Sequence, residues 1–488
     1  MRKSALVTLG TLSAAVTALA ACSSAPASSS GKSPNTSGKT YVWAIAEDFS
    51  DLDTANIQSF GNAYAAGLFD SVLLNYQETP PSGLTCPALG ATPTMVPSHL
   101  VKSFSVSPDG KTISFVLNSG VKSQYGNTLS SADVKWSIDR EAAIDVIGQA
   151  LMFDLASINK ADPITVTGPM SFTINLARPN DIALYELNLI WQNIYDSKAA
   201  QAHATTADPW AKAWLANHEA NFGPWKLQSF VPDQSMTIVP NPYWDGPRGN
   251  ISKVVLETVS DASTRQELVE SGGAQSVDRL SLDQNASLTG NAGVVNCPSA
   301  YRDLLGLNVH DPILGKVQVR QAISLAINRQ QLVSAVYRGF AKPAASGVAS
   351  VFDPTAGTSN FVYDPARAKQ LLAAAGYPHG FSMTISIAPS STGDYATSLA
   401  EFLVADLANV GIKATIATVG SAAQYMGQLK KLAYQAFVYD EQPSFSDPGY
   451  AYVLNNGCVG LQSFSGWCDQ AADALALKIE STTGPAKA

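Results

Sequence analysis

Hydrophobic residues in the second half of the chain switch between two spacings, and this alternation limits the folds that the chain can form. Across 319–327 they recur at every third and fourth position, which is typical of one buried helix face. Across 381–387 they recur at every second position, as in a half-buried strand. Helical spacing returns in 365–375 and 399–410. Helices and strands that alternate in this way predict a sheet covered by helices, so the fold class is α/β.

The first half gives weaker signals of the same kind. Ile113, Phe115 and Leu117 alternate as in a half-buried strand. The sequence 130–133 is a capping motif that predicts the start of a helix. A hairpin is expected over 226–239.

The N-terminus has the pattern of a secretory signal. A basic start at Arg2 and Lys3 precedes a weakly apolar run over 5–19, and small residues come directly before Cys22. This order is typical of a signal that ends in a lipobox, where the Cys22 thiol receives a diacylglyceryl group. We expect residues 1–21 to be removed; the alternative is an ordinary signal peptide cleaved elsewhere.

The sequence after the signal predicts an extracytoplasmic protein held at the cell membrane by its lipid. Residues 22–40 are rich in Ser, Gly and Pro and are expected to form a flexible tether. No later stretch reaches about 18 uninterrupted apolar residues, so no spanning helix is expected.

Four further cysteines would lie in an oxidising compartment. A Cys458–Cys468 disulfide is favoured because glycines and polar residues between them permit a short closed loop. Cys86–Cys297 then follows only by elimination. Free buried thiols remain the alternative.

Composition and motifs argue against nucleic-acid binding and against catalysis. The formal net charge is −8 and hydrophobic residues make up 46%, which indicates an acidic globular protein. The chain lacks Gly-x-Ser-x-Gly and Gly-x-Gly-x-x-Gly. Its five histidines are scattered along the sequence, so neither a metal site nor a cofactor is expected. An extracellular hydrolase is the disfavoured alternative to a binding protein.

A series of short motifs runs in register from about residue 41 to 480. In chain order they are 96–103 (VPSHLVKS), 108–112 (PDGKT), 129–134 (LSSADV), 223–227 (GPWKL), 241–244 (NPYW), 261–265 (DASTR), 307–308 (LN), 319–323 (VRQAI), 328–329 (NR), 363–365 (YDP) and 375–378 (AGYP). Together they resemble the signature of family 5 extracellular solute-binding proteins, the oligopeptide-, dipeptide- and nickel-binding lipoproteins of ABC importers.

The resemblance implies a two-lobed periplasmic-binding-protein-like fold with an extra α/β subdomain in the first lobe. Solutes of such proteins are enclosed between the lobes when a hinge closes. The ranges that it implies are lobe I over 41–70 and 194–300, the inserted subdomain over 71–193 and lobe II over 301–488. Family members usually continue into a helix and a strand that return to lobe I, and this chain is expected to lack them.

The resemblance also points to a ligand-binding segment. In peptide-binding members, an acidic residue before an Asp-Pro pair holds the α-amino group of the ligand. Asp440 is the first choice here, with Asp447 as the acid of the Asp-Pro pair; the spacing between them is longer than in the family. Asp440 as the cap of a turn is the alternative. Tyr439 and Phe445 are candidates for stacking on the solute or for core packing.

The implied function is a receptor that carries out no covalent chemistry. It would act as a monomer and deliver a small solute, with a peptide favoured, to the permease and ATPase of an ABC importer. A lipoprotein that senses a solute without transporting it is the alternative.

Overall fold

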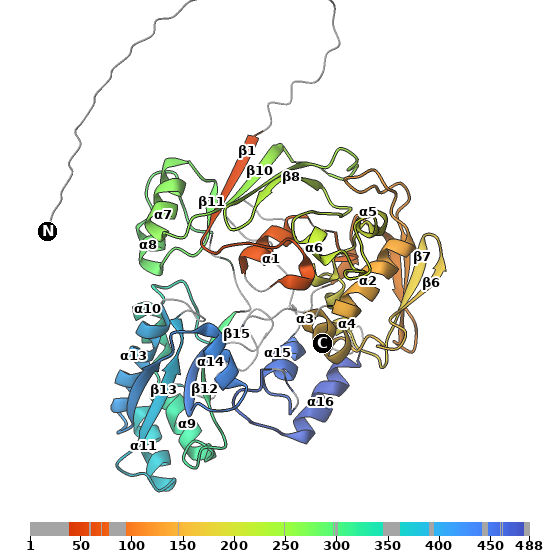
Figure 1. The fold of residues 1–488 in the computed structure, drawn as a ribbon. Coiled ribbons are helices and arrows are strands. Elements are labelled where there is room, and N and C mark those ends of the chain that lie inside the picture. The colour runs from red at the N-terminus through yellow and green to blue at the C-terminus, as the bar shows by residue number, and fades with distance from the viewer. Residues whose placement is uncertain are drawn as a thin grey trace, which may run out of the picture. The chain divides into compact units, whose positions relative to one another are not determined.

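The computed structural model describes residues 39–57, 60–69, 71–77, 94–144, 146–247, 249–295, 297, 301–344, 362–389, 395–441, 448–458, 460 and 462–482. The expected signal peptide, its Cys22 and nearly all of the expected tether lie outside these residues. Figure 1 shows three larger groups of strands, each with its own helices. Among the described residues, no helix is both long enough and apolar enough to cross a membrane.

The first sheet joins the start of the described chain to its middle. Its five strands have the order β11-β1-β10-β9-β8, in which β1 runs parallel to β10 and β11. The bounds are β1 Lys39–Ile45, β8 Trp225–Val231, β9 Ser235–Pro240, β10 Ile251–Thr258 and β11 Ser276–Val277. The antiparallel β8–β9 pair confirms the predicted hairpin. Ile45, Phe49 and Leu256 are part of the core that packs on this sheet.

The second sheet is antiparallel and has its own core. Its order is β4-β5-β7-β6, with β4 Val101–Val106, β5 Thr112–Leu117, β6 Ile164–Gly168 and β7 Ser171–Asn175. Ile113, Phe115 and Leu117 on β5 are 1–2% exposed, so the predicted strand is confirmed. Helix α2 (Ser131–Ile144) begins where the capping motif predicts, and the Asp133 carboxylate accepts hydrogen bonds from Ser130.

Short elements complete the first half of the chain. The strands are β2 Leu74–Tyr76 and β3 Met95–Pro97, and the helices are η1 Thr54–Asn56, α1 Phe60–Gly67, α3 Val146–Gln149, η2 Ala150–Leu155, α4 Ile182–Glu186, η3 Ile190–Gln192, α5 Ser197–Gln201 and α6 Lys212–Leu215. Helices α7 Ala262–Ser271 and α8 Leu282–Ser287 follow β10 and β11.

The third sheet is formed by the second half of the chain. Its order is β12-β15-β13-β14; β13 is parallel to β14 and β15, and β12 is antiparallel to β15. The strands are β12 Arg302–Leu307, β13 Ser382–Ile387, β14 Lys413–Thr418 and β15 Ala436–Glu441. The helices are α9 Val317–Ala326, α10 Arg329–Ala335, α11 Pro365–Ala374, α13 Tyr395–Ala408 and α14 Ala422–Leu429. Apolar residues of α9, α11 and α13 share one core with this sheet, which confirms the alternation expected from the sequence.

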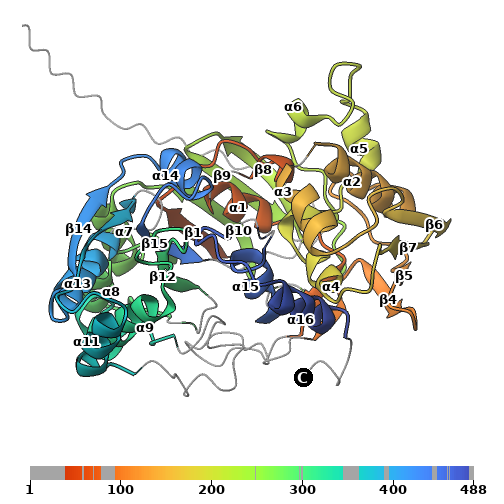
Figure 2. The same ribbon diagram turned by 90° about the horizontal axis from the view of Figure 1, so that it is seen from below.

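The last two helices contact the first half of the chain. Leu454 of α15 (Pro448–Asn455) is buried in the same core as β5 and α4. Glu480 of α16 (Gln470–Glu480) accepts a hydrogen bond from Arg178 Nη2 at 3.0 Å, and its backbone oxygen accepts one from the Asp181 amide at 3.2 Å. Figure 2 shows α16 beside α4. We therefore propose that residues 448–482 belong with lobe I, whereas the boundary expected from the sequence assigns them to lobe II.

Candidate functional site

Two carboxylates lie opposite one another at the start of β12 and near the end of β15. Asp303 pairs in register with Asp440 across these antiparallel strands. Directly opposed residues of an antiparallel pair project from the same face of the sheet, so the two carboxylates are neighbours. Asp440 is half-buried, and Asp303 is exposed.

Two tyrosines hold the Asp303 carboxylate. The Tyr337 hydroxyl donates to Oδ2 at 2.8 Å, and the Tyr395 hydroxyl donates to Oδ1 at 2.7 Å. Tyr337 follows α10 and Tyr395 begins α13, and their ring centroids are 5.6 Å apart. Three separate elements therefore fix the position of this side chain.

The surroundings of Asp303 disfavour its charged form. Partial loss of hydration raises the pKa of Asp303, although the hydrogen bonds from Tyr395 and Tyr337 act in the opposite direction. Loss of hydration and the negative charges of Asp303 and Asp440 likewise raise the pKa values of Tyr337 and Tyr395. Asp303 is thus open to solvent but surrounded by enough protein to lose part of its hydration.

Charged and aromatic residues that follow the first sheet act on the same region. Arg279 follows β11, and its Nη1 lies 2.7 Å from Oε1 of Glu47, which follows β1. Loss of hydration raises the pKa of Tyr301, and the nearby Asp440 raises it further, whereas Arg279 lowers it. The Tyr301 side chain is 55% exposed. Arg279 therefore acts electrostatically on Tyr301 and Tyr395, two aromatic residues of the region that holds the acids.

A buried ion pair lies next to the two acids on the opposite face of the strands. Arg302 pairs in register with Glu441, and Arg302 Nε donates to Glu441 Oε2 at 2.7 Å. Both side chains are almost inaccessible, at 4% and 0% exposed. Successive side chains of a strand point to opposite faces, so this pair fixes the strand ends from behind the face that carries Asp303 and Asp440.

The other residues expected at the site divide into three groups. Tyr439 is 8% exposed and its ring lies edge-on to Phe464 at 5.2 Å, which fits the core-packing alternative. Phe445 and Asp447 lie outside the described residues. Asp440 lies on β15 opposite Asp303, next to the two tyrosines that hold the Asp303 carboxylate.

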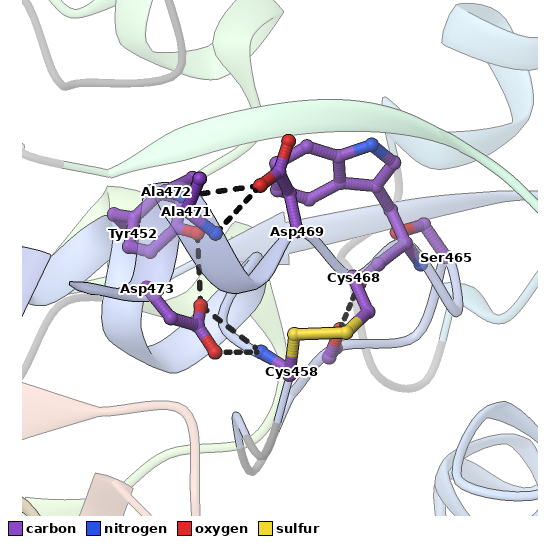
Figure 3. Close-up of a disulfide and its surroundings, with 10 residues drawn as sticks. Tyr452, Cys458, Ser465, Cys468, Asp469, Ala471, Ala472 and Asp473 are labelled. Carbon is purple, nitrogen blue, oxygen red and sulfur yellow. Dashed lines mark hydrogen bonds between the residues drawn. A yellow bond between two sulfur atoms is a disulfide. The ribbon is translucent and has the colours of Figure 1, made fainter. Parts of the chain in front are cut away.

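The cysteines form disulfides where the structure describes them. Cys458 and Cys468 are joined, which confirms the favoured pair, and the Cys458 amide donates to the Asp473 carboxylate (Figure 3). Cys297 is also disulfide-bonded. Cys86, its expected partner, lies outside the described residues.

Asp303, Tyr337 and Tyr395 could not be identified from the sequence. Each is an isolated polar or aromatic residue without a motif around it, and they meet only because β12 pairs with β15 between α10 and α13. Within the described part of the chain, no group of three or more His, Cys, Asp or Glu residues is arranged to hold a metal ion.

Comparison with known proteins places the chain in a family. Residues 95–462 match the sequence model for bacterial extracellular solute-binding proteins, family 5 (middle region). The chain belongs to this family and is a solute-binding protein.

Individual relatives agree with that assignment. The glutathione-binding protein GsiB of Salmonella paratyphi A is 27% identical over 424 residues, which cover 83% of this chain and 75% of the relative.

Among solved structures, the periplasmic binding protein DppA of Helicobacter pylori, in complex with the peptide STSA, is similar with a TM-score of 0.71 at 22% identity, over 92% of this chain and 88% of that one. NikZ of Campylobacter jejuni, in complex with Ni(L-His), also has a TM-score of 0.71, at 16% identity, over 92% and 87%. These similarities confirm the expected two-lobed α/β fold.

Proposed function

We propose that this protein is a lipid-anchored extracytoplasmic receptor that binds a small solute with a free amino group and delivers it to an ABC importer. A peptide is the favoured solute. The receptor binds and releases the solute without covalent chemistry, acts as a monomer and requires no cofactor. Cys22 carries the lipid after removal of residues 1–21, and the partners are the permease and ATPase of the importer.

The opposition of Asp303 and Asp440 is the observation that carries this proposal. Like charges directly opposite one another across a strand pair are unfavourable. A cationic group placed against both carboxylates removes this repulsion. An ammonium group that leaves water also needs a carboxylate partner, because its desolvation is otherwise unfavourable.

The two acids have different tasks in this site. The tyrosine hydroxyls on both oxygens of Asp303 hold its carboxylate in one orientation. Asp440 then provides the direct contact to the ammonium group, and Asp303 adds negative charge beside it. The exposed ring of Tyr301 offers an apolar surface next to the amine.

The ligands of two relatives are consistent with an amine site. Glutathione and the peptide STSA, named for the relatives described above, both carry a free α-amino group. The nickel complex bound by NikZ shows that the same fold also accepts other solutes. An amine site in the present chain favours a peptide over a metal chelate as its solute.

Native mass spectrometry of the purified protein tests the solute class directly. Denaturation after purification would release and identify any bound molecule, and calorimetric titration with the dipeptide Met-Leu and with glutathione would then measure affinity. N-acetyl-Met-Leu is the matched control, because it keeps the side chains and lacks the charged amine. Equal affinity for the acetylated and free dipeptides would contradict the amine site, and a bound sugar or metal chelate would exclude a peptide.

The lipid anchor requires a separate experiment. Metabolic labelling with a radioactive fatty acid is expected to label the wild-type chain and leave Cys22→Ala unlabelled. Release of the labelled wild-type protein by washing the membranes with high salt would contradict anchoring by lipid.

A further inference from the structure

The loop that follows α15 returns to the strand that carries Asp440. Phe464 in this loop is 4% exposed, and its ring packs against Phe437 and Tyr439 of β15, with centroids 6.5 and 5.2 Å away. The Ser465 carbonyl accepts a hydrogen bond from the Val309 amide, which follows β12, at 2.9 Å. The loop therefore contacts β15 on the face opposite to Asp440 and also the segment that follows β12.

Gly466 brings the loop close to lobe II. Its φ is +69°, and a Cβ atom there would lie 2.6 Å from the His310 ring. A side chain at this position would have to displace His310, so the contact depends on glycine.

The helices on either side of the same loop are packed on the first half of the chain. Leu454 of α15 is buried in the core of the second sheet, and Glu480 of α16 pairs with Arg178. Glu480 is 1% exposed, so this pair is buried on the side of α16. The segment 448–482 thus contacts lobe I at its two helices and lobe II at the loop between them.

The Cys458–Cys468 disulfide closes this loop at its base. Cys458 follows α15 and Cys468 directly precedes Asp469, the N-cap of α16. The Asp473 carboxylate of α16 accepts hydrogen bonds from the Cys458 amide at 3.2 Å and from the Tyr452 hydroxyl of α15 at 2.9 Å. Figure 3 shows these contacts around the disulfide. The base of the loop is therefore fixed to both helices.

We propose that the disulfide-closed loop 458–468 is a mechanical link that couples the solute-binding strand β15 to lobe I. The disulfide holds the adjoining ends of α15 and α16 together, and Phe464 between them packs against β15, so hinge motion of β15 against lobe I acts on this contact. The link holds β15 in the position from which Asp440 binds solute. The proposal rests on the proposed function, because it assigns the loop a role in solute affinity.

Two variants separate the disulfide from the contact that it supports. Cys458→Ser/Cys468→Ser opens the loop, and Phe464→Ala removes its contact with β15 while keeping the disulfide. Hydrogen exchange of residues 302–307 and 436–441 is measured without solute, and glutathione affinity is measured by calorimetry. We expect both variants to accelerate exchange in these strands and to weaken glutathione binding by about 5- to 10-fold.

The combined variant gives the sharpest comparison. If the disulfide acts through Phe464, then adding Phe464→Ala to the double serine variant produces little further loss, because both changes remove the same coupling. Fully additive losses would overturn the proposal. Unchanged exchange in 302–307 and 436–441 for either variant would overturn it as well.

A control variant distinguishes coupling from general loss of stability. Phe230 of β8 is partly buried and stacks on Phe49 in the core of the first sheet, which is separate from the core that holds Leu454. Phe230→Ala is expected to lower the unfolding temperature without changing exchange in the two strands. If wild-type protein does not bind glutathione, that solute is wrong for the proposed function, and the exchange measurement still decides whether the loop couples β15 to α15 and α16.

Discussion

Asp303 and Asp440 occupy opposed register positions on β12 and β15, and both oxygens of Asp303 accept hydrogen bonds from tyrosine hydroxyls at 2.7 and 2.8 Å. Two acids on one face of a strand pair are unfavourable in an empty site. Tyr337 and Tyr395 hold the Asp303 carboxylate through both of its oxygens. In the proposed function, a cationic solute relieves the repulsion between the two acids.

Removal of the Asp440 charge tests this arrangement most directly. Asp440→Asn keeps the size of the side chain and is expected to weaken binding of Met-Leu by about 10- to 100-fold, because a hydrogen bond to a charged group contributes about 1.5 to 3 kcal/mol. Calorimetric titration measures the affinity, and circular dichroism checks that the fold is intact. Unchanged affinity in a folded variant would show that Asp440 does not contact the solute.

The raised pKa of Asp303 predicts a specific pH dependence of stability. Because its pKa in the folded protein is above the ordinary 3.8, the folded state keeps a proton that the unfolded state has lost. This contribution to stability is fully present below pH 3.8 and is lost as pH rises through the raised pKa. Measured by urea unfolding, the wild type should therefore lose stability relative to Asp303→Asn as the pH rises above 3.8.

Tyr395→Phe provides the control for that pH series. The Tyr395 hydroxyl lowers the pKa of Asp303, so its removal should raise that pKa further. The loss of stability is then expected at higher pH than in the wild type. Identical pH profiles for the wild type and Asp303→Asn would mean that Asp303 does not titrate in this range.

Much of the fold could be predicted because local sequence patterns specify it. Alternating apolar residues predict β5 and β13, and the i, i+3, i+4 spacing predicts α9, because each pattern reports one buried face. The Cys458–Cys468 disulfide could also be predicted, because the two cysteines lie close together in the sequence. In each case the information lies within a short window of sequence.

The rest of the site depends on contacts between distant segments. Asp303 becomes a neighbour of Asp440 only through the register of β12 on β15, and a shift of one residue would place it on the other face. The contact of Glu480 with Arg178 likewise depends on how α16 packs on the first half of the chain. No periodicity in the sequence reports such tertiary pairings.

The buried Arg302–Glu441 pair predicts an asymmetric response to substitution. Arg302→Met leaves the Glu441 carboxylate buried without its cation and should lower the free energy of unfolding by about 3 to 5 kcal/mol. Arg302→Met/Glu441→Leu removes both charges and should recover most of that loss. Urea unfolding measures both variants, and a double variant as unstable as the single one would show that packing, and not the unpaired charge, causes the effect.

Two glycines near β13 have different surroundings. Their replacement by alanine is therefore expected to lower the free energy of unfolding by different amounts. Gly376 and Gly380 both have positive φ, at +94° and +74°. A Cβ atom on Gly376 would meet nothing within 4 Å, whereas one on Gly380 would lie 1.9 Å from the Gly411 carbonyl oxygen. Gly376→Ala should thus lower the free energy of unfolding by about 1 to 2 kcal/mol, because alanine disfavours this backbone conformation.

Gly380→Ala carries the same backbone cost and adds a collision with the backbone that enters β14. That backbone is held by the Lys413 amide, which donates to the Phe381 carbonyl at 2.8 Å, so it cannot move away without loss of this hydrogen bond. We expect a loss of about 3 kcal/mol or more, and a clear separation of the two variants in urea unfolding. Equal losses would mean that the chain around Gly411 adjusts freely, and that the positive φ at each glycine accounts for the whole effect.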